Sequence, residues 1–223
     1  MFMPNSLWIL IVSTLSIAFL HALAPDHWMP FAAIGRAQKW SKLKLLWVTF
    51  ISGLGHVGIS IAFSIIGILL GFSLTKLKGL EGHRGEVALW LLIGFGLAYM
   101  VWGIKKAKDH HHDHPDADQL KAKTVALWTM FAIIVLGPCE PLIPLVFLGY
   151  NYGWTGVVIV SVVFSMVTII MMLAQSLLAF EGIQLIKSSL VERYSHAFAG
   201  FVIEILDSGK RMLALPVEPN CRI

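Results

Sequence analysis

The chain has 223 residues, of which 57% are hydrophobic and 13% are charged, and its formal net charge at pH 7 is +4. Soluble domains carry roughly 25% charged residues, so the composition excludes an ordinary water-soluble enzyme domain and predicts an integral membrane protein. The apolar blocks continue for about 20 residues or more, which favours membrane helices over the alternating strands of a barrel. The positive charge is modest and lies between the apolar blocks, so it gives no reason to expect nucleic-acid binding.

The first apolar block is interrupted by residues 21–27, whose sequence is HALAPDH. Ionisable groups inside a bilayer are costly unless they are paired, ligated or facing water. Pro25 has no N–H, so the carbonyl of His21 loses its helical donor and the helix must kink or unwind. The opened backbone could turn His21, Asp26 and His27 into one pocket and add carbonyl oxygens, a ligand set that suits nickel, cobalt or zinc. The alternative is a helix end at the membrane surface, where polar residues are ordinary.

Further hydrophobic spans follow the first one along the chain. They are expected at about residues 45–72, 87–104, 125–148 and 155–180, with an abbreviated sixth at about 196–206. Residues 76–86 are expected to form a polar loop. The loops after the first and third spans carry four and five Lys or Arg residues, against three between the second and third spans. This asymmetry predicts a multi-pass protein of the plasma (inner) membrane, with its N-terminus outside and the loop after the third span in the cytoplasm.

Two membrane segments share one layout, namely Leu, a small residue, Pro and two ligand-type residues. Residues 23–27 read LAPDH and residues 136–140 read LGPCE. Three spans separate the two starts, so two halves of this kind would be inverted, as in many transporters. Chance similarity is the alternative.

The sequence therefore predicts an all-α polytopic membrane protein with about six transmembrane helices in two inverted three-helix repeats, the first and fourth helices being broken. The expected limits are one transporter domain over residues 1–207, with repeats at 5–104 and 124–207, a loop at 105–123 and a polar tail at 208–223.

Three further residues within the apolar spans carry ligand chemistry. His56 follows Gly55 in a segment of small residues that lets another backbone approach, so a metal ligand and a packing histidine are both open readings. Cys139 and Glu140 lie in the second interrupted segment and are candidates for metal binding or gating in that half. Glu140 is the stronger of the two, because a buried carboxylate requires a cation or a proton.

The loop at 105–123 is rich in histidine and aspartate. Its candidate metal-capture residues are Asp109, His110, His111, His112, Asp113 and His114. Histidine-rich tracts bind transition metals, loosely when the chain is mobile. The alternative is a solvated polar loop without a ligand.

These motifs together resemble those of the nickel/cobalt transporter family. Residues 21–27 fit its H-x4-D-H signature, and residues 54–56 (LGH) resemble its second-helix element. Residues 136–141 (LGPCEP) resemble the Gly-x-Pro-Cys-x-Pro stretch of the compact nickel/cobalt efflux and urease-accessory membrane proteins, which are linked to the lysine-exporter superfamily. The resemblance covers about residues 7–205, and this chain departs from it at Asp207, where the sixth span should continue.

The resemblance implies two inverted three-helix halves and a nickel or cobalt ion bound by His21, Asp26 and His27 with help from His56. We therefore expect a secondary-type permease for Ni²⁺ or Co²⁺, with Zn²⁺ as a further candidate, and neither an enzyme nor a protein with a tightly bound cofactor. The sequence contains no P-loop to supply ATP-driven transport. Import and export are both compatible with it.

Expected partners are the lipid bilayer and the divalent cation, with a cytoplasmic metallochaperone as a candidate, and an oligomer is compatible with the sequence. Metal binding should weaken below about pH 6, because histidine ligates only when deprotonated. One alternative is an accessory membrane protein that delivers nickel to urease or hydrogenase maturation. Another is a thiol-redox electron carrier, which is disfavoured because Asp26 stands where the first half would need a cysteine.

Overall fold

The chain folds into helices throughout the part that the computed structural model describes, which is residues 4–108, 117–137, 139–185 and 201. The elements are α1 (Pro4–Ala22), the 3-10 helix η1 (Pro25–His27), α2 (Met29–Ala37), α3 (Lys42–Leu69), α4 (Leu74–Lys108), α5 (Ala117–Leu136), α6 (Leu142–Tyr150) and α7 (Gly153–Leu185). The predicted all-α class is confirmed. The histidine-rich segment 109–114, the polar tail and, apart from residue 201, the expected sixth span at 196–206 lie outside the described residues.

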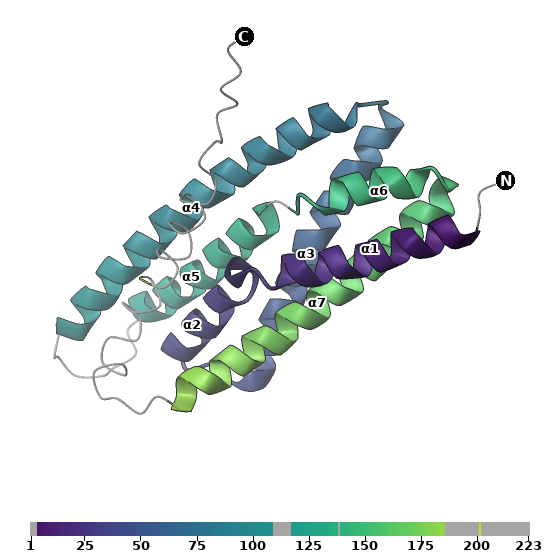
Figure 1. Cartoon of the computed structure of the whole chain (residues 1–223). Helices are drawn as coiled ribbons and strands as arrows, with labels where there is room; N and C mark the ends of the chain where they lie inside the picture. Colours follow the sequence, from purple (N-terminus) through teal and green to yellow (C-terminus); the bar gives the residue numbers. More distant parts are fainter. Residues whose placement is uncertain (1–3, 109–116, 138, 186–200, 202–223) are drawn as a thin grey trace, which may run out of the picture.

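The bundle contains two interrupted helical segments and three continuous helices, α3, α4 and α7 (Figure 1). Helix α1 is followed by η1 and α2, and helix α5 is followed by α6, so both interruptions expected from the proline-containing segments are present. The start of α1, the α3–α4 turn and the α6–α7 turn lie at one end of the bundle (Figure 1). Both interruptions lie near the middle of its length, where their polar groups can meet.

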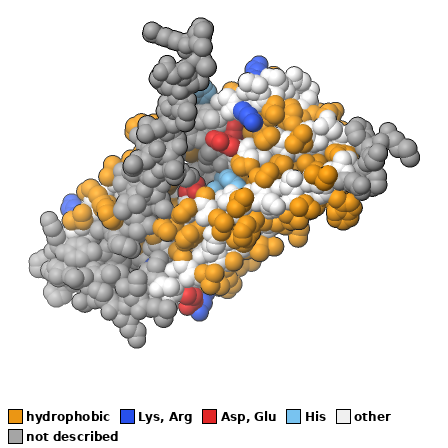
Figure 2. All heavy atoms as spheres, viewed as in Figure 1, with side chains coloured by type: hydrophobic (Ala, Val, Ile, Leu, Met, Phe, Trp, Pro, Cys, Tyr) orange, Lys and Arg blue, Asp and Glu red, His pale blue; other side chains and the backbone are white. Residues whose placement is uncertain are grey.

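Three of the described helices, α3, α4 and α7, are long and apolar enough to cross a membrane. Shorter apolar stretches occupy Ser6–Ala22 in α1 and Leu127–Leu136 in α5, each of which leads into a break. Many large apolar side chains face outward, and hydrophobic residues cover much of the described surface that is visible in Figure 2. Such a surface is compatible with a lipid environment, in which apolar exposure carries no penalty.

The interior consists of two hydrophobic clusters, one on each side of the breaks. One gathers side chains of α2, α3, α4, α5 and α7 around Phe31, Met130 and Phe180, and the other joins α1, α6 and α7 around Leu142 and Phe164. Small residues allow close helix approaches, which are a common basis of helix packing in membranes. A Cβ atom on Gly55 of α3 would lie 2.5 Å from Cγ2 of Val135 on α5.

Helix α4 differs from its prediction. The polar stretch 76–86 was expected to be a loop, but α4 begins at Leu74 and runs without interruption to Lys108. Glu81 and Arg84 are three residues apart and therefore share a side of the helix, where they pair and turn inward, with Glu81 only 1% exposed. Helix α5 likewise begins at Ala117, so helical structure extends into both ends of the segment 105–123 that was predicted to be a loop. A hydropathy profile locates the apolar part of a helix, but it misses polar helical turns even when their residues favour helix formation.

Candidate metal centre

The first break replaces helical hydrogen bonds with shorter turns that occupy several of its carbonyl groups. The N–H of Ala24 donates to the carbonyl of His21 at 3.2 Å, which replaces the four-residue helical bond with a three-residue turn. The indole Nε1 of Trp28 donates to the carbonyl of Leu23 at 3.3 Å. Pro25 then starts the single 3-10 turn that directs His27 inward, where it is 5% exposed. The His21 carbonyl has therefore lost its four-residue helical donor, as predicted, and accepts from Ala24 instead.

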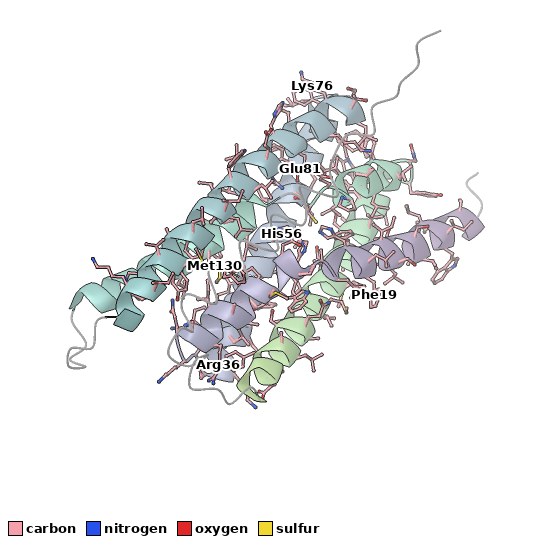
Figure 3. All side chains as sticks on the ribbon, turned by 60° about the vertical axis from the view of Figure 1, so that its left-hand side comes forward. Phe19, Arg36, His56, Lys76, Glu81 and Met130 are labelled. Atoms are coloured by element: carbon pink, nitrogen blue, oxygen red, sulfur yellow. The ribbon has the colours of Figure 1, made fainter. Side chains whose placement is uncertain are left out.

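Three histidines from three elements meet behind this break. His21 ends α1, His27 ends η1 and His56 lies midway along α3, and each offers a ring nitrogen within 4.8 Å of the other two. The ring centroids of His21 and His27 are 4.4 Å apart, and those of His27 and His56 are 5.0 Å apart, with nearly perpendicular rings in both pairs. Figure 3 places His56 inside the bundle, between Arg36 towards one end and Lys76 at the other.

His56 has the hydrogen-bonding pattern of a metal-ligating histidine. Its Nδ1 lies 3.0 Å from the carbonyl oxygen of Ile134, which can only accept, so Nδ1 carries the proton. The lone pair of Nε2 is then available, and this buried atom has no hydrogen-bond partner among the described residues. Ligating histidines commonly donate their second ring nitrogen to a carbonyl or carboxylate, which fixes the tautomer and aims the other nitrogen. Of the two readings left open by the sequence, this geometry favours the ligand.

Asp26 lies beside the three-histidine cluster and faces one of its members. Its Oδ1 is 3.3 Å from Nδ1 of His27, and its side chain is 20% exposed. The structure thus shows a contact between the Asp26 carboxylate and the His27 ring that does not have hydrogen-bond geometry, and the ligand role of Asp26 stays a prediction.

The second break brings a thiol to the histidines. Sγ of the fully buried Cys139 lies 3.5 Å from Nε2 of His21, although the two residues are 118 positions apart. For a tetrahedral ion with a metal–sulfur distance of about 2.3 Å and a metal–nitrogen distance of about 2.05 Å, neighbouring S and N ligands lie about 3.5 Å apart. The His21–Cys139 spacing therefore fits two ligands of one ion, whereas the group of ligand atoms that all lie within 4.8 Å of one another comprises the three histidines without Cys139. Glu140 is exposed and stands away from this cluster.

A cavity of about 320 Å³ leads from the histidines towards the surface. Its lining includes Asp26, His27 and His56 together with Gly82, Glu86 and Glu140. Glu86 and Glu140 are exposed, so carboxylates flank the outer part of the cavity and imidazoles lie at its inner part. Figure 2 shows histidine and acidic side chains close together in the middle of a largely hydrophobic face. This distribution of charge would attract cations.

Sequence reasoning missed the contribution of α4, whose Glu81, Arg84 and Glu86 were all assigned to a loop. The available signal was the Glu-x-x-Arg spacing next to an apolar span, which pairs two charges on one helical face. His83, on the same helix, is exposed. The candidate capture residues Asp109 to His114 lie beyond the part of the chain that the structure describes.

Comparisons with known proteins returned no matching family model and no significant match to a curated protein or a solved structure. The functional assignment therefore depends on the geometry of this site.

Proposed function

We propose that this protein is a membrane permease for divalent transition-metal cations, with Co²⁺ and Ni²⁺ as its first candidate substrates and Zn²⁺ as the next. The observation that carries the proposal is the cluster of three histidine nitrogens within 4.8 Å of one another, at the meeting point of two broken helices. The motif resemblance to nickel/cobalt transporters supports the same substrate class.

The ligand chemistry selects this class of cation. Imidazole nitrogens and a thiol suit cobalt, zinc and nickel, whereas Mg²⁺ and Ca²⁺ prefer sets of oxygen ligands. Cys139 is the one cysteine in the described residues and faces a histidine. This environment favours metal ligation over thiol exchange, which needs two sulfurs that can approach each other.

The depth of the site is that expected for a transporter. Helix α3 has 28 residues, and His56 lies near its centre, about 20 Å from either end at a rise of about 1.5 Å per residue. Central sites on paired broken helices are characteristic of secondary transporters with inverted halves. We accordingly propose two inverted halves, one built on α1–α4 and the other starting with α5–α7. The Lys and Arg distribution supports an outside N-terminus, and the inward turn of Arg84 removes one positive charge from the outer loops.

The division of ligands between the halves supplies a release mechanism. His21, His27 and His56 belong to the first half, and Cys139 belongs to the second. If the halves rock relative to each other, the sulfur withdraws and the ion is left with three imidazoles, which hold it less tightly. Substrate then leaves through whichever side the movement has opened, as alternating access requires.

Flux into proteoliposomes tests the proposal. Wild-type protein should move Co²⁺ and Ni²⁺ across the membrane, and His27→Ala and His56→Ala should each abolish the flux. His83→Ala is the matched control, because it removes an exposed histidine from α4 and should leave the flux unchanged. Equal flux in all four proteins would refute the site. Metal binding without flux in the wild type would instead favour the accessory role in nickel delivery.

A further inference from the structure

A buried ion pair on α4 reaches across the bundle to the second break. The carboxylate of Glu81 is 1% exposed and the side chain of Arg84 is 10% exposed, and the two are joined through Nη2 and Oε1. Ser60 on α3 completes the group by donating to Glu81 Oε1 at 3.2 Å and accepting from Arg84 Nη2 at 2.9 Å. Figure 3 shows Glu81 between Lys76 and His56 along the bundle. A buried ion pair is a poor source of stability compared with apolar packing, so its presence here calls for another reason.

The pair holds two backbone groups of the second break. Helix α5 ends at Leu136 and α6 begins at Leu142. Between them, Arg84 Nη2 donates to the carbonyl of Gly137 at 3.1 Å, and the N–H of Cys139 donates to Glu81 Oε1 at 3.2 Å. A buried backbone group without a partner is destabilising, so these contacts stabilise the interrupted conformation inside the bundle.

The same contacts determine where the thiol stands. The N–H of Cys139 is held by Glu81, while its Sγ lies 3.5 Å from Nε2 of His21. Arg84 also binds α3, through Ser60 and by lying over the ring of Phe63 with its guanidinium carbon 5.3 Å from the centroid. Helix α3 carries His56. One charged pair therefore ties the segment that bears the thiol to the helix that bears a histidine.

We infer that Glu81 and Arg84 are positioning residues that hold Cys139 as the fourth, thiolate ligand of the metal bound by the three histidines. The inference rests on the proposed function, since it assigns a role in the same site. Neither residue touches the ion. Their effect is to complete a tetrahedral set of three nitrogens and one sulfur, which suits Co²⁺ and Zn²⁺ and disfavours ions that need six oxygen ligands.

Co²⁺ spectroscopy of the full-length protein in detergent provides the first test. Removing one member of the pair would leave a buried charge, so the variant is the neutral double substitution Glu81→Leu with Arg84→Met, a kind of replacement that buried pairs often tolerate. We expect wild type to show a thiolate-to-Co²⁺ charge-transfer band and the double variant to lose it while still binding Co²⁺ through histidine. Cys139→Ser should reproduce that loss. Glu81→Gln with Arg84→Met keeps an acceptor for the Cys139 N–H and should regain part of the band.

Alkylation of Cys139 without metal provides the second test and does not depend on the proposed function. In a Cys221→Ser background the buried thiol should react slowly with N-ethylmaleimide, and the Glu81→Leu, Arg84→Met variant should react about tenfold faster or more, because the break is no longer held closed. The matched control neutralises the exposed Lys42–Glu181 pair, which joins α3 to α7 at 2.6 Å, and should change neither readout.

The two tests separate the two ideas. A full charge-transfer band and unchanged alkylation in the double variant would overturn the positioning role and leave the metal site standing. Absence of Co²⁺ binding in wild type would overturn the proposed function and, with it, the role of Cys139 as a ligand.

Discussion

Replacing His56 by alanine is the sharpest perturbation of the site, because it removes one ring nitrogen of the cluster without leaving a backbone acceptor unpaired. His56 Nδ1 contacts the carbonyl of Ile134, but that carbonyl also accepts the N–H of Gly137 at 3.1 Å. The substitution therefore leaves no orphaned acceptor. What it removes is one imidazole whose Nε2 has no hydrogen-bond partner in the described structure.

The expected loss of affinity follows from the ligand count. Four-ligand zinc sites in peptides bind with apparent free energies of about 10–16 kcal/mol at pH 7, so one ligand of four contributes about 2.5–4 kcal/mol. At about 1.36 kcal/mol per tenfold change, His56→Ala should weaken Co²⁺ or Zn²⁺ binding by about a hundredfold to a thousandfold.

Isothermal titration of detergent-purified protein measures this change directly. His83→Ala is the control, because that histidine is exposed on α4 and lies outside the cluster. Thermal unfolding of both variants without metal separates lost ligation from lost folding, because truncating the buried His56 leaves a cavity and should lower stability whether or not metal is bound. A dissociation constant for His56→Ala within about threefold of wild type would refute the ligand assignment, since that difference is under about 1 kcal/mol.

Other substitutions and conditions probe packing, access and protonation. Gly55→Ala places a Cβ 2.5 Å from Val135 Cγ2, so it should lower stability by about 1–3 kcal/mol, and adding Val135→Ala should restore much of the loss in thermal unfolding; additive effects would contradict the contact. Gly82 lines the cavity, and a Cβ atom added there meets nothing within 4 Å, so the Gly82→Leu variant should fold. Its larger side chain should narrow the cavity and slow Co²⁺ association in stopped-flow measurements. An unchanged association rate would show that Co²⁺ reaches the site by another route. Lowering the pH from about 7.5 to about 5.5 should weaken Co²⁺ binding, because protons compete for three imidazoles, and a flat profile would argue against histidine ligation. Deleting residues 110–114 should change metal sensitivity in cells with flux retained in proteoliposomes, and complete loss of flux would contradict an auxiliary role for that loop.

Much of the fold could be predicted because its signals are local. Pro25 and Pro138 each remove a backbone donor within an apolar block, so two broken helices could be expected from the chain alone. The polar stretch at 76–86 was wrongly predicted to be a loop, because the contacts that bury its charges are not local signals. Glu81 and Arg84 look like loop residues in a hydropathy profile, and their mutual pairing is what makes them compatible with the interior of the bundle.

The candidate metal centre also contains residues that the sequence identified and residues whose place only the structure showed. His21 and His27 were identifiable because two histidines and an aspartate flank a helix break within a few residues. The contact of Asp26 with His27 and the place of Glu140 at the cavity could not be predicted. Both depend on the packing of segments that are distant in sequence. His56 could be a ligand or a packing residue until the carbonyl of Ile134 was seen to fix its tautomer.

The sequence by itself determined that this chain is helical and apolar, where two helices break, and which residues carry metal-binding chemistry, because proline geometry and the burial cost of charge act within a few residues. Only the tertiary structure decided which of those residues share a site. Cys139 reaches His21 across 118 positions, and the α4 pair that holds it acts through the backbone of the break. Such contacts arise from helix packing over the whole bundle, which no local pattern encodes.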